Sequence, residues 1–126
     1  YSELVNSMVP GYRGLPQFDL MLLGLGDDGH IASIFPDRPD LFTTSALFEV
    51  ALRPDKKQKR ITATGKLINN SSKIYYIVTG KGKASIVSQV LEGKSGSELY
   101  PASRVMPVSG HLVWMLDTGA ASLLKA

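Results

Sequence analysis

Cysteine is absent from the sequence, and histidine occurs only twice. The lack of cysteine excludes disulfide frameworks, thiolate metal sites and cysteine nucleophiles. Two histidines leave little room for a histidine-rich metal centre, so we expect no bound metal. Long apolar stretches are also lacking, since no run approaches the ~18 residues that a membrane-spanning helix needs. Residues 1–8 lack the leading basic region of a signal peptide, so we expect a cytoplasmic protein with no membrane partner.

The sequence has no strong excess of one charge. Fourteen Lys and Arg residues stand against 11 Asp and Glu residues, for a net charge of +3. This balance suits a small anionic substrate and is too weak to indicate nucleic acid. The basic run at residues 56–60 is flanked by Asp55 and contains no aromatic residue, which is typical of a solvated loop. We therefore expect no nucleic-acid partner.

The chain has 126 residues, 44% of them hydrophobic, which is enough for a single domain spanning residues 1–126. Apolar runs at 18–25, 73–79 and 111–116 have the length of buried strands, and the run at 18–25 is typical of a strand buried on both faces. The other predicted elements are a helix end and loop at 1–17, a helical turn at 30–35, strands at 46–52 and 60–64, and helices at 65–72, 80–93 and 118–126. We expect Gly93 to cap the end of the second of these helices and Asp117 to cap the start of the last.

This order of strands and helices predicts an α/β fold with a mostly parallel sheet and flanking helices. Right-handed crossovers bring the carboxyl ends of parallel strands to one edge of such a sheet. Ligands bind outside that edge. Polar residues that follow the buried strands are therefore the first candidates for a functional site.

A loop rich in glycine and aspartate follows the first buried strand, at residues 24–29. Its sequence, GLGDDG, matches the G-x-G-x-x-G fingerprint of dinucleotide-binding folds, and Glu49 lies 20 residues beyond the last glycine. Two features disfavour a dinucleotide site. Pro36 leaves room for little more than one helical turn, and the carboxylates of Asp27 and Asp28 would repel a pyrophosphate.

His30 comes directly after this loop, and we expect it to project from the ligand-binding edge of the sheet. An imidazole titrates near cellular pH, which suits a general base, and Asp28 is placed to orient the ring or contact a substrate hydroxyl. A purely structural interpretation is also open, in which Asp27 and Asp28 form a turn and His30 caps a helix. Ser33 lies three residues further on, but the G-x-S-x-G elbow of a nucleophilic serine is absent.

A longer pattern extends over residues 18–36, FDLMLLGLGDDGHIASIFP. It resembles the signature of the 6-phosphogluconolactonase family, which is approximately F-D-L-x-L-L-G-x-G-x-D-G-H-T-A-S-L-F-P. Shorter stretches resemble further motifs of that family in the same order along the chain. They are R-I-T at 60–62, T-G-K-G-K-A at 79–84, P-A-S-R-V at 101–105 and W-M-L-D at 114–117.

Two departures from the family pattern affect the interpretation. Position 31 is Ile where the family usually has Thr. The family's D-E-R motif, which supplies an arginine for the substrate phosphate, is absent. Family members are also roughly twice as long as this chain. We therefore expect residues 1–126 to be the C-terminal half of a larger domain with a modified Rossmann-like α/β fold. The missing N-terminal half of the same protein is then a partner, and an isolated half is expected to be poorly active.

The resemblance implies hydrolysis of 6-phosphoglucono-δ-lactone to 6-phosphogluconate in the pentose phosphate pathway, without a cofactor. It implies that His30 takes a proton from the attacking water and returns it to the departing ring oxygen, with Asp28 assisting. The implied substrate-binding residues are Gly24, Gly26, Asp27, Gly29, Ser33, Arg60 and Lys83. A structural alternative pairs Arg60 with a nearby acid and leaves Lys83 solvated.

Two other functions stay open at this point. The related glucosamine-6-phosphate deaminase family has a similar loop that agrees at Ile31 and Ala32 but continues F-N-E-P, whereas this chain continues S-I-F-P at 33–36. The second is a catalytically silent module that binds a sugar phosphate. Ammonia release from an amino-sugar phosphate would identify a deaminase, and binding without turnover would identify a silent module.

Overall fold

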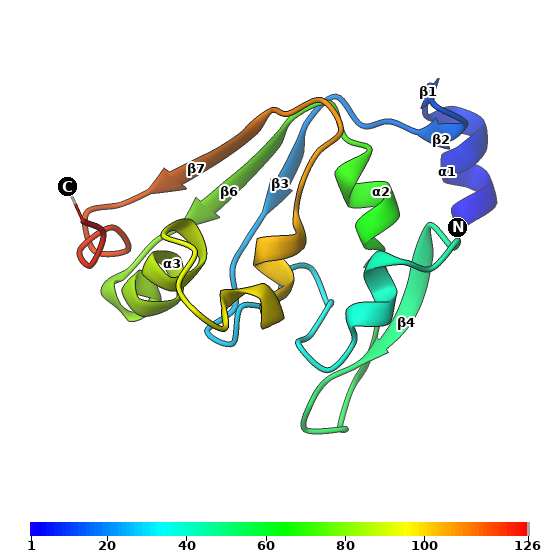
Figure 1. The fold of residues 1–126 in the computed structure, drawn as a ribbon. Coiled ribbons are helices and arrows are strands. Elements are labelled where there is room, and N and C mark those ends of the chain that lie inside the picture. The colour runs from blue at the N-terminus through cyan, green and yellow to red at the C-terminus, as the bar shows by residue number, and fades with distance from the viewer. Residues whose placement is uncertain (126) are drawn as a thin grey trace.

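The computed structural model describes residues 1–125. Its central element is a parallel sheet of three strands, β3 (Met21–Leu23), β6 (Ile74–Val78) and β7 (Leu112–Leu116), in the order β3-β6-β7 (Figure 1). Leu23 lies opposite Tyr76, and Tyr76 lies opposite Trp114. The α/β class and the three strands predicted from apolar runs are confirmed, although β3 is shorter than the run that contains it.

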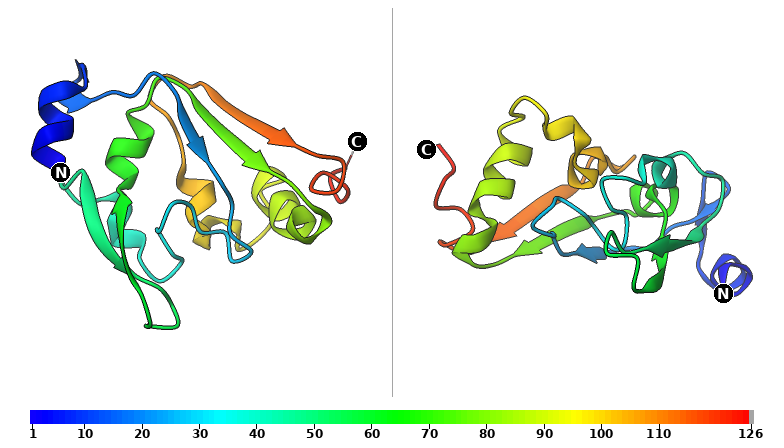
Figure 2. Two further views of the ribbon diagram at one scale, coloured as in Figure 1. Left: turned by 180° about the vertical axis from the view of Figure 1, so that it is seen from behind. Right: turned by 90° about the horizontal axis from the view of Figure 1, so that it is seen from below.

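Side chains alternate between the two faces of this sheet. Leu23, Tyr76 and Val78 are buried, whereas Leu22 and Met115 project from the opposite face and are 57% and 52% exposed. The helices α2 (Gly65–Asn69) and α3 (Ala84–Leu91) lie together on the covered side (Figure 2). The prediction that the first strand is buried on both faces is therefore wrong within residues 1–125, because no described element covers the second face.

The strands predicted at 46–52 and 60–64 are β4 (Phe48–Leu52) and β5 (Lys59–Ala63). They pair antiparallel as a separate hairpin, with Ala51 opposite Arg60, and do not extend the parallel sheet. The turn of this hairpin points to the same side of the molecule as the loop that follows β3 (Figure 1).

Residues 1–17, predicted as a helix end and a loop, contain α1 (Ser2–Met8) and a short hairpin of β1 (Gly11–Tyr12) and β2 (Leu15–Pro16). Asn70, which follows α2, donates side-chain hydrogen bonds to backbone carbonyl oxygens of both short strands. These bonds fasten the N-terminal hairpin to the body of the fold. No helix among residues 1–125 combines the length and the apolar character needed to cross a membrane.

The helix predicted at 80–93 begins with a 3-10 turn, η2 (Lys81–Lys83), and continues as α3. Gly93 follows its end with a φ of +57°, as expected for a glycine cap. Three further 3-10 segments were not predicted; they are η1 (Pro39–Phe42), η3 (Ser97–Leu99) and η4 (Pro101–Arg104).

The final predicted helix does not form over residues 118–125, which adopt turns, and residue 126 lies outside the described residues. Asp117 does accept the N–H of Ala120 at 2.7 Å, as a cap would. Its carboxylate also accepts the N–H of Gly80 at 3.0 and 2.9 Å. Gly80 lies just after β6. The Asp117 carboxylate therefore links the C-terminal segment to the end of β6, and residues 118–125 turn at this point.

Candidate active site

The loop that follows β3, here called the Gly-Asp loop (residues 24–34), closes on itself at the carboxyl end of the sheet. Gly26 donates its N–H to the carbonyl oxygen of His30 at 2.9 Å. Ile31 and Ile34 are fully buried and exchange two backbone hydrogen bonds. The two isoleucines anchor the loop in the core, and this anchoring fixes the backbone of His30.

The helical turn predicted at 30–35 is wrong, because the Ile31–Ile34 pair forms a β-bridge instead. Ala32 between them has a φ of +48°, which a right-handed helix does not allow. The dinucleotide fingerprint requires a helix directly after its glycines. The Gly-Asp loop supplies none, which agrees with the sequence-based preference against a dinucleotide site.

Asp28 orients the His30 ring. The Nδ1 of His30 lies 2.5 Å from Asp28 Oδ1, and the His30 backbone N–H donates to the same oxygen at 3.1 Å. When the neutral ring donates Nδ1–H to Asp28, the lone pair of Nε2 is the acceptor that remains. The ring is 29% exposed and packs near Phe35, with the ring centroids 4.8 Å apart. A fixed, partly exposed imidazole with an oriented Nε2 is suited to general-base chemistry.

Two glycines of the loop are required by close contacts. A Cβ built on Gly26 would lie 2.0 Å from His30 Nδ1, so the ring occupies the space that a side chain would fill. Gly29 has a φ of +79°, and a Cβ there would lie 2.6 Å from the Tyr100 ring. A Cβ on Gly24 would meet no atom within 4 Å, so its backbone is open to solvent or ligand.

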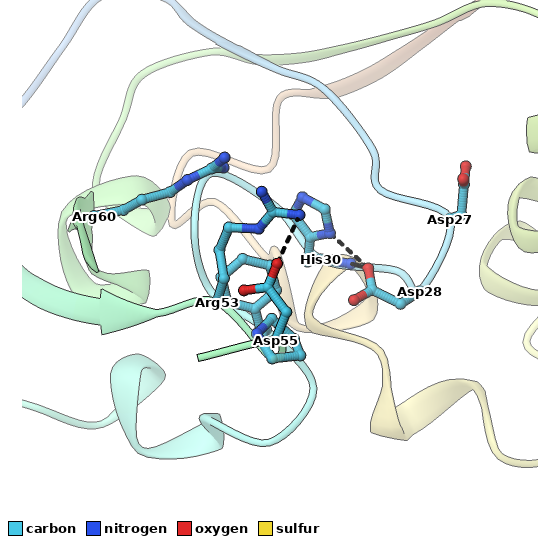
Figure 3. Close-up of a pocket in the computed structure, with 8 residues that line it drawn as sticks. Asp27, Asp28, His30, Arg53, Asp55 and Arg60 are labelled. Atoms are coloured by element: carbon cyan, nitrogen blue, oxygen red, sulfur yellow. Dashed lines mark hydrogen bonds and ion pairs between the residues drawn. The ribbon is translucent and has the colours of Figure 1, made fainter. Parts of the chain in front are cut away.

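His30 lies between two pockets. The first, here called the arginine pocket, has a volume of about 450 Å³ and is lined by Asp27, Asp28, His30, Phe35, Arg53, Pro54, Asp55 and Arg60 (Figure 3). The second, the lysine pocket, has a volume of about 370 Å³ and is lined by Gly24, Leu25, Gly26, His30, Ala32 and Lys83. His30 is the residue that lines both.

The cations of the site have different partners. Lys83 Nζ lies 2.5 Å from Asp27 Oδ1, and this ammonium, more than any other group, lowers the pKa of the Asp27 carboxyl below its usual value. Arg60 donates from Nε and Nη2 to Oε1 of Gln58, at 3.3 and 3.2 Å. Among residues 1–125 its guanidinium forms no ion pair. Within the described part of the chain the structural alternatives are therefore not met, because Arg60 pairs with no carboxylate there and Lys83 forms an ion pair with Asp27.

The structure thus brings most of the implied site residues around His30, but on two sides of it. Asp27 and Asp28 join Arg60 in the arginine pocket, whereas Gly24 and Gly26 join Lys83 in the lysine pocket.

Ser33 and Gly29 line neither pocket. Ser33 is buried, and its N–H donates to Thr62 Oγ1 at 3.1 Å, which ties the Gly-Asp loop to β5. Gly29 accepts the N–H of Ala102 on its carbonyl oxygen. Both residues are thus placed to support the loop.

Sequence reasoning missed Arg53, which lines the arginine pocket and lies 3.5 Å from the Asp55 carboxylate. The basic run at residues 56–60 was interpreted as a solvated loop, and Arg53 just before it was not named. The signal that could have revealed Arg53 is the pair of adjacent strands predicted at 46–52 and 60–64. Two strands that pair antiparallel place side chains from both on one face.

Free backbone N–H groups in the Gly-Asp loop would be able to stabilise an oxyanion. The N–H groups of Gly26, Gly29 and His30 are already used inside the loop. Among residues 1–125, no acceptor contacts the N–H groups of Asp27 and Asp28, which both line the arginine pocket. The same part of the chain contains no cluster of three or more His, Asp or Glu side chains that would hold a metal ion.

Comparisons with known proteins agree with this architecture. A family model described as glucosamine-6-phosphate isomerases/6-phosphogluconolactonase matches residues 1–114. The chain is 47% identical over 90 residues to a 6-phosphogluconolactonase of Treponema pallidum, covering 71% of this chain and 37% of that protein. It is 40% identical over 111 residues to a 6-phosphogluconolactonase of Bos taurus, covering 87% of this chain and 43% of that protein.

A solved structure described as devB protein superimposes with a TM-score of 0.92 at 36% identity, covering 98% of this chain and 52% of that chain. The fold of residues 1–125 is therefore that of a solved protein. The chain spans less than half the length of each of these two curated relatives.

Proposed function

The chain belongs to the glucosamine-6-phosphate isomerase/6-phosphogluconolactonase family, and from this premise we propose that the protein containing it hydrolyses 6-phosphoglucono-δ-lactone to 6-phosphogluconate. The observation that carries the proposal is the His30–Asp28 pair, which stands between two pockets supplied with cations. In this proposal the reaction belongs to the pentose phosphate route in the cytoplasm.

His30 Nε2 removes a proton from a water molecule as the water oxygen attacks the lactone carbonyl carbon. The carbonyl oxygen becomes an oxyanion in a tetrahedral intermediate. When the intermediate collapses, the bond between that carbon and the ring oxygen breaks, and His30 returns the proton to the ring oxygen. A single imidazole therefore serves first as base and then as acid, at a typical gain of about 100- to 10,000-fold in rate.

Asp28 supports both steps by holding the ring. Its Oδ1 accepts Nδ1–H at 2.5 Å, which selects the tautomer with Nε2 available for the water. When His30 is protonated, the same contact becomes an ion pair that stabilises the imidazolium. Asp28 is thus a positioning residue, and the backbone N–H groups of Asp27 and Asp28 are the local donors available to the oxyanion.

The phosphate of the substrate is assigned to the arginine pocket. Arg60 offers a guanidinium without a carboxylate partner among residues 1–125. A guanidinium fork binds phosphate with two parallel hydrogen bonds. Lys83 forms an ion pair with Asp27 and lines the lysine pocket, so we propose that it contacts the sugar part of the substrate rather than the phosphate.

The rest of the site is proposed to come from polypeptide outside residues 1–126. The relatives are more than twice as long as the region they share with this chain. The exposed face of the parallel sheet, with Leu22, Ile77, Val113 and Met115, offers an apolar surface for that remaining half. Parallel sheets are normally covered on both faces, which supports this assignment.

The test is an activity assay of the full natural chain that contains residues 1–126. Conversion of 6-phosphoglucono-δ-lactone above its spontaneous rate is the expected result. Ammonia release from glucosamine 6-phosphate, with no lactone hydrolysis, would replace the proposal by a deaminase. Binding of 6-phosphogluconate without turnover of either substrate would indicate a silent module.

A further inference from the structure

Arg53 lines the arginine pocket but lies outside every motif that resembles the family. It follows β4, and its N–H donates to the carbonyl oxygen of Gln58 across the hairpin at 3.0 Å. Ala51 lies opposite Arg60 in the β4–β5 register. Because side chains alternate along a strand and cross-strand partners share a face, Arg53 and Arg60 project from the same face of the hairpin. Figure 3 shows both guanidinium groups directed toward the His30 ring.

Asp55 is the present partner of Arg53, and the contact is weak. Its Oδ2 lies 3.5 Å from Arg53 Nη2, beyond the usual N–H···O distance, and the two side chains are 39% and 44% exposed. Asp55 Oδ1 separately accepts the N–H of Lys57 at 3.0 Å. The carboxylate therefore keeps a partner in the hairpin turn when Arg53 turns to another anion.

We infer that Arg53 binds the substrate phosphate together with Arg60, and that Asp55 occupies Arg53 while the pocket is empty. This inference rests on the proposed lactonase function. A phosphate monoester carries nearly two negative charges at neutral pH, so two guanidinium groups match its charge where one does not. Asp55 is an internal competitor, because each bound anion has to displace it from Arg53. A phosphate dianion gains most from that exchange, so the Arg53–Asp55 pair favours phosphorylated lactones over unphosphorylated ones.

The experiment compares Arg53→Gln, Asp55→Asn and Lys57→Gln in the full natural chain. Arg53→Gln removes the guanidinium. Asp55→Asn removes the competing charge but keeps an oxygen for the Lys57 N–H. Lys57→Gln removes one positive charge from the same hairpin without touching the pocket lining, so it controls for long-range electrostatics. Each variant is assayed with 6-phosphoglucono-δ-lactone and with unphosphorylated glucono-δ-lactone.

Arg53→Gln is expected to raise KM for the phosphorylated lactone about tenfold, which corresponds to the loss of one charge-assisted hydrogen bond. Its kcat is expected to stay nearly unchanged. Asp55→Asn is expected to lower that KM, and Lys57→Gln to change it less than about twofold. The unphosphorylated lactone is expected to show no difference among the three variants. Equal effects of Arg53→Gln and Lys57→Gln, or equal effects of Arg53→Gln on both lactones, would overturn the inference.

Failure of the proposed function is recognised separately, as absence of lactone hydrolysis by the unmodified chain. Titration calorimetry with inorganic phosphate then tests Arg53 directly. An affinity about tenfold weaker in Arg53→Gln than in Lys57→Gln supports the shared anion site. An unchanged affinity in Arg53→Gln contradicts it.

Discussion

Replacing Gly26 by Ala tests how tightly the loop positions His30. A Cβ at this position would lie 2.0 Å from Nδ1 and 2.2 Å from Cε1 of the His30 ring. Ordinary contacts between non-bonded heavy atoms begin at about 3.5 Å, so the ring has to retreat by roughly 1.5 Å. That movement breaks the 2.5 Å contact with Asp28 that orients the ring. Gly26 does not have a left-handed φ, so its backbone accepts alanine without strain.

The expected loss is large in rate and small in stability. A misplacement of about 1 Å at a reacting group costs on the order of 100-fold, equivalent to about 2.7 kcal/mol of transition-state stabilisation. We therefore expect kcat of Gly26→Ala to fall about 100-fold or more, because Nε2 no longer faces the attacking water. The free energy of unfolding is expected to change by about 1 kcal/mol or less, since a glycine-to-alanine change also restricts the unfolded chain.

The assay is lactone hydrolysis by the full natural chain, corrected for the spontaneous reaction, together with urea unfolding of the same samples. Gly82→Ala is the matched control, because a Cβ there meets no atom within 4 Å and the glycine has no left-handed φ. A Gly26→Ala variant with the kcat of the unmodified protein would refute the reasoning. So would a loss of activity explained entirely by unfolded protein.

Three further outcomes are expected. Asp28→Asn should lower kcat about tenfold with little change in KM, because a neutral amide stabilises the imidazolium less than a carboxylate does; an unchanged kcat would remove Asp28 from the mechanism. The Asp117 pKa is lowered mainly by the N–H of Ala120 and also by that of Gly80. The stability that Asp117 contributes is therefore present above about pH 4 and is lost as the pH falls through its folded pKa. In urea unfolding, Asp117→Ala should destabilise the protein at neutral pH and have a progressively smaller effect toward about pH 2. Leu22→Glu places a charge on the exposed sheet face. If polypeptide outside residues 1–126 covers that face, the variant should destabilise the full natural chain by about 2–4 kcal/mol in urea unfolding. A change below about 0.5 kcal/mol would contradict the assignment of that face to the remaining half.

The strands and the identity of the loop were predictable because their signals are local. The apolar runs that became β6 and β7 mark strands by composition alone. The Gly-Asp loop was recognisable in part because Gly26 is required by a contact only four residues along the chain, with the His30 ring. Such short-range constraints leave a pattern in the sequence.

The errors concern features decided by distant contacts. Residues 30–35 do not form a helical turn because Ile31 and Ile34 are drawn into the core and pair with each other. The last segment turns because the Asp117 carboxylate accepts the N–H of Gly80, which lies 37 positions earlier. In both segments tertiary contacts override the local preference for a helix. Those contacts are not visible in the sequence alone.

The composition of the site was predictable in part. His30, Asp28 and Arg60 were named from the loop and the resemblance, and all of them line the arginine pocket. Arg53 was not named, because its place depends on the hairpin register rather than on a motif. The division of the cations between two pockets was also hidden, since the ion pair of Lys83 with Asp27 joins residues 56 positions apart.

The most direct measurement is the steady-state hydrolysis of 6-phosphoglucono-δ-lactone by the full natural chain and its His30→Ala variant. With His30 as the general base, kcat falls about 100- to 10,000-fold while KM stays within a few fold, because the imidazole acts on the water rather than on substrate affinity. Equal kcat values for the two proteins would contradict the account, since another group would then have to activate the water.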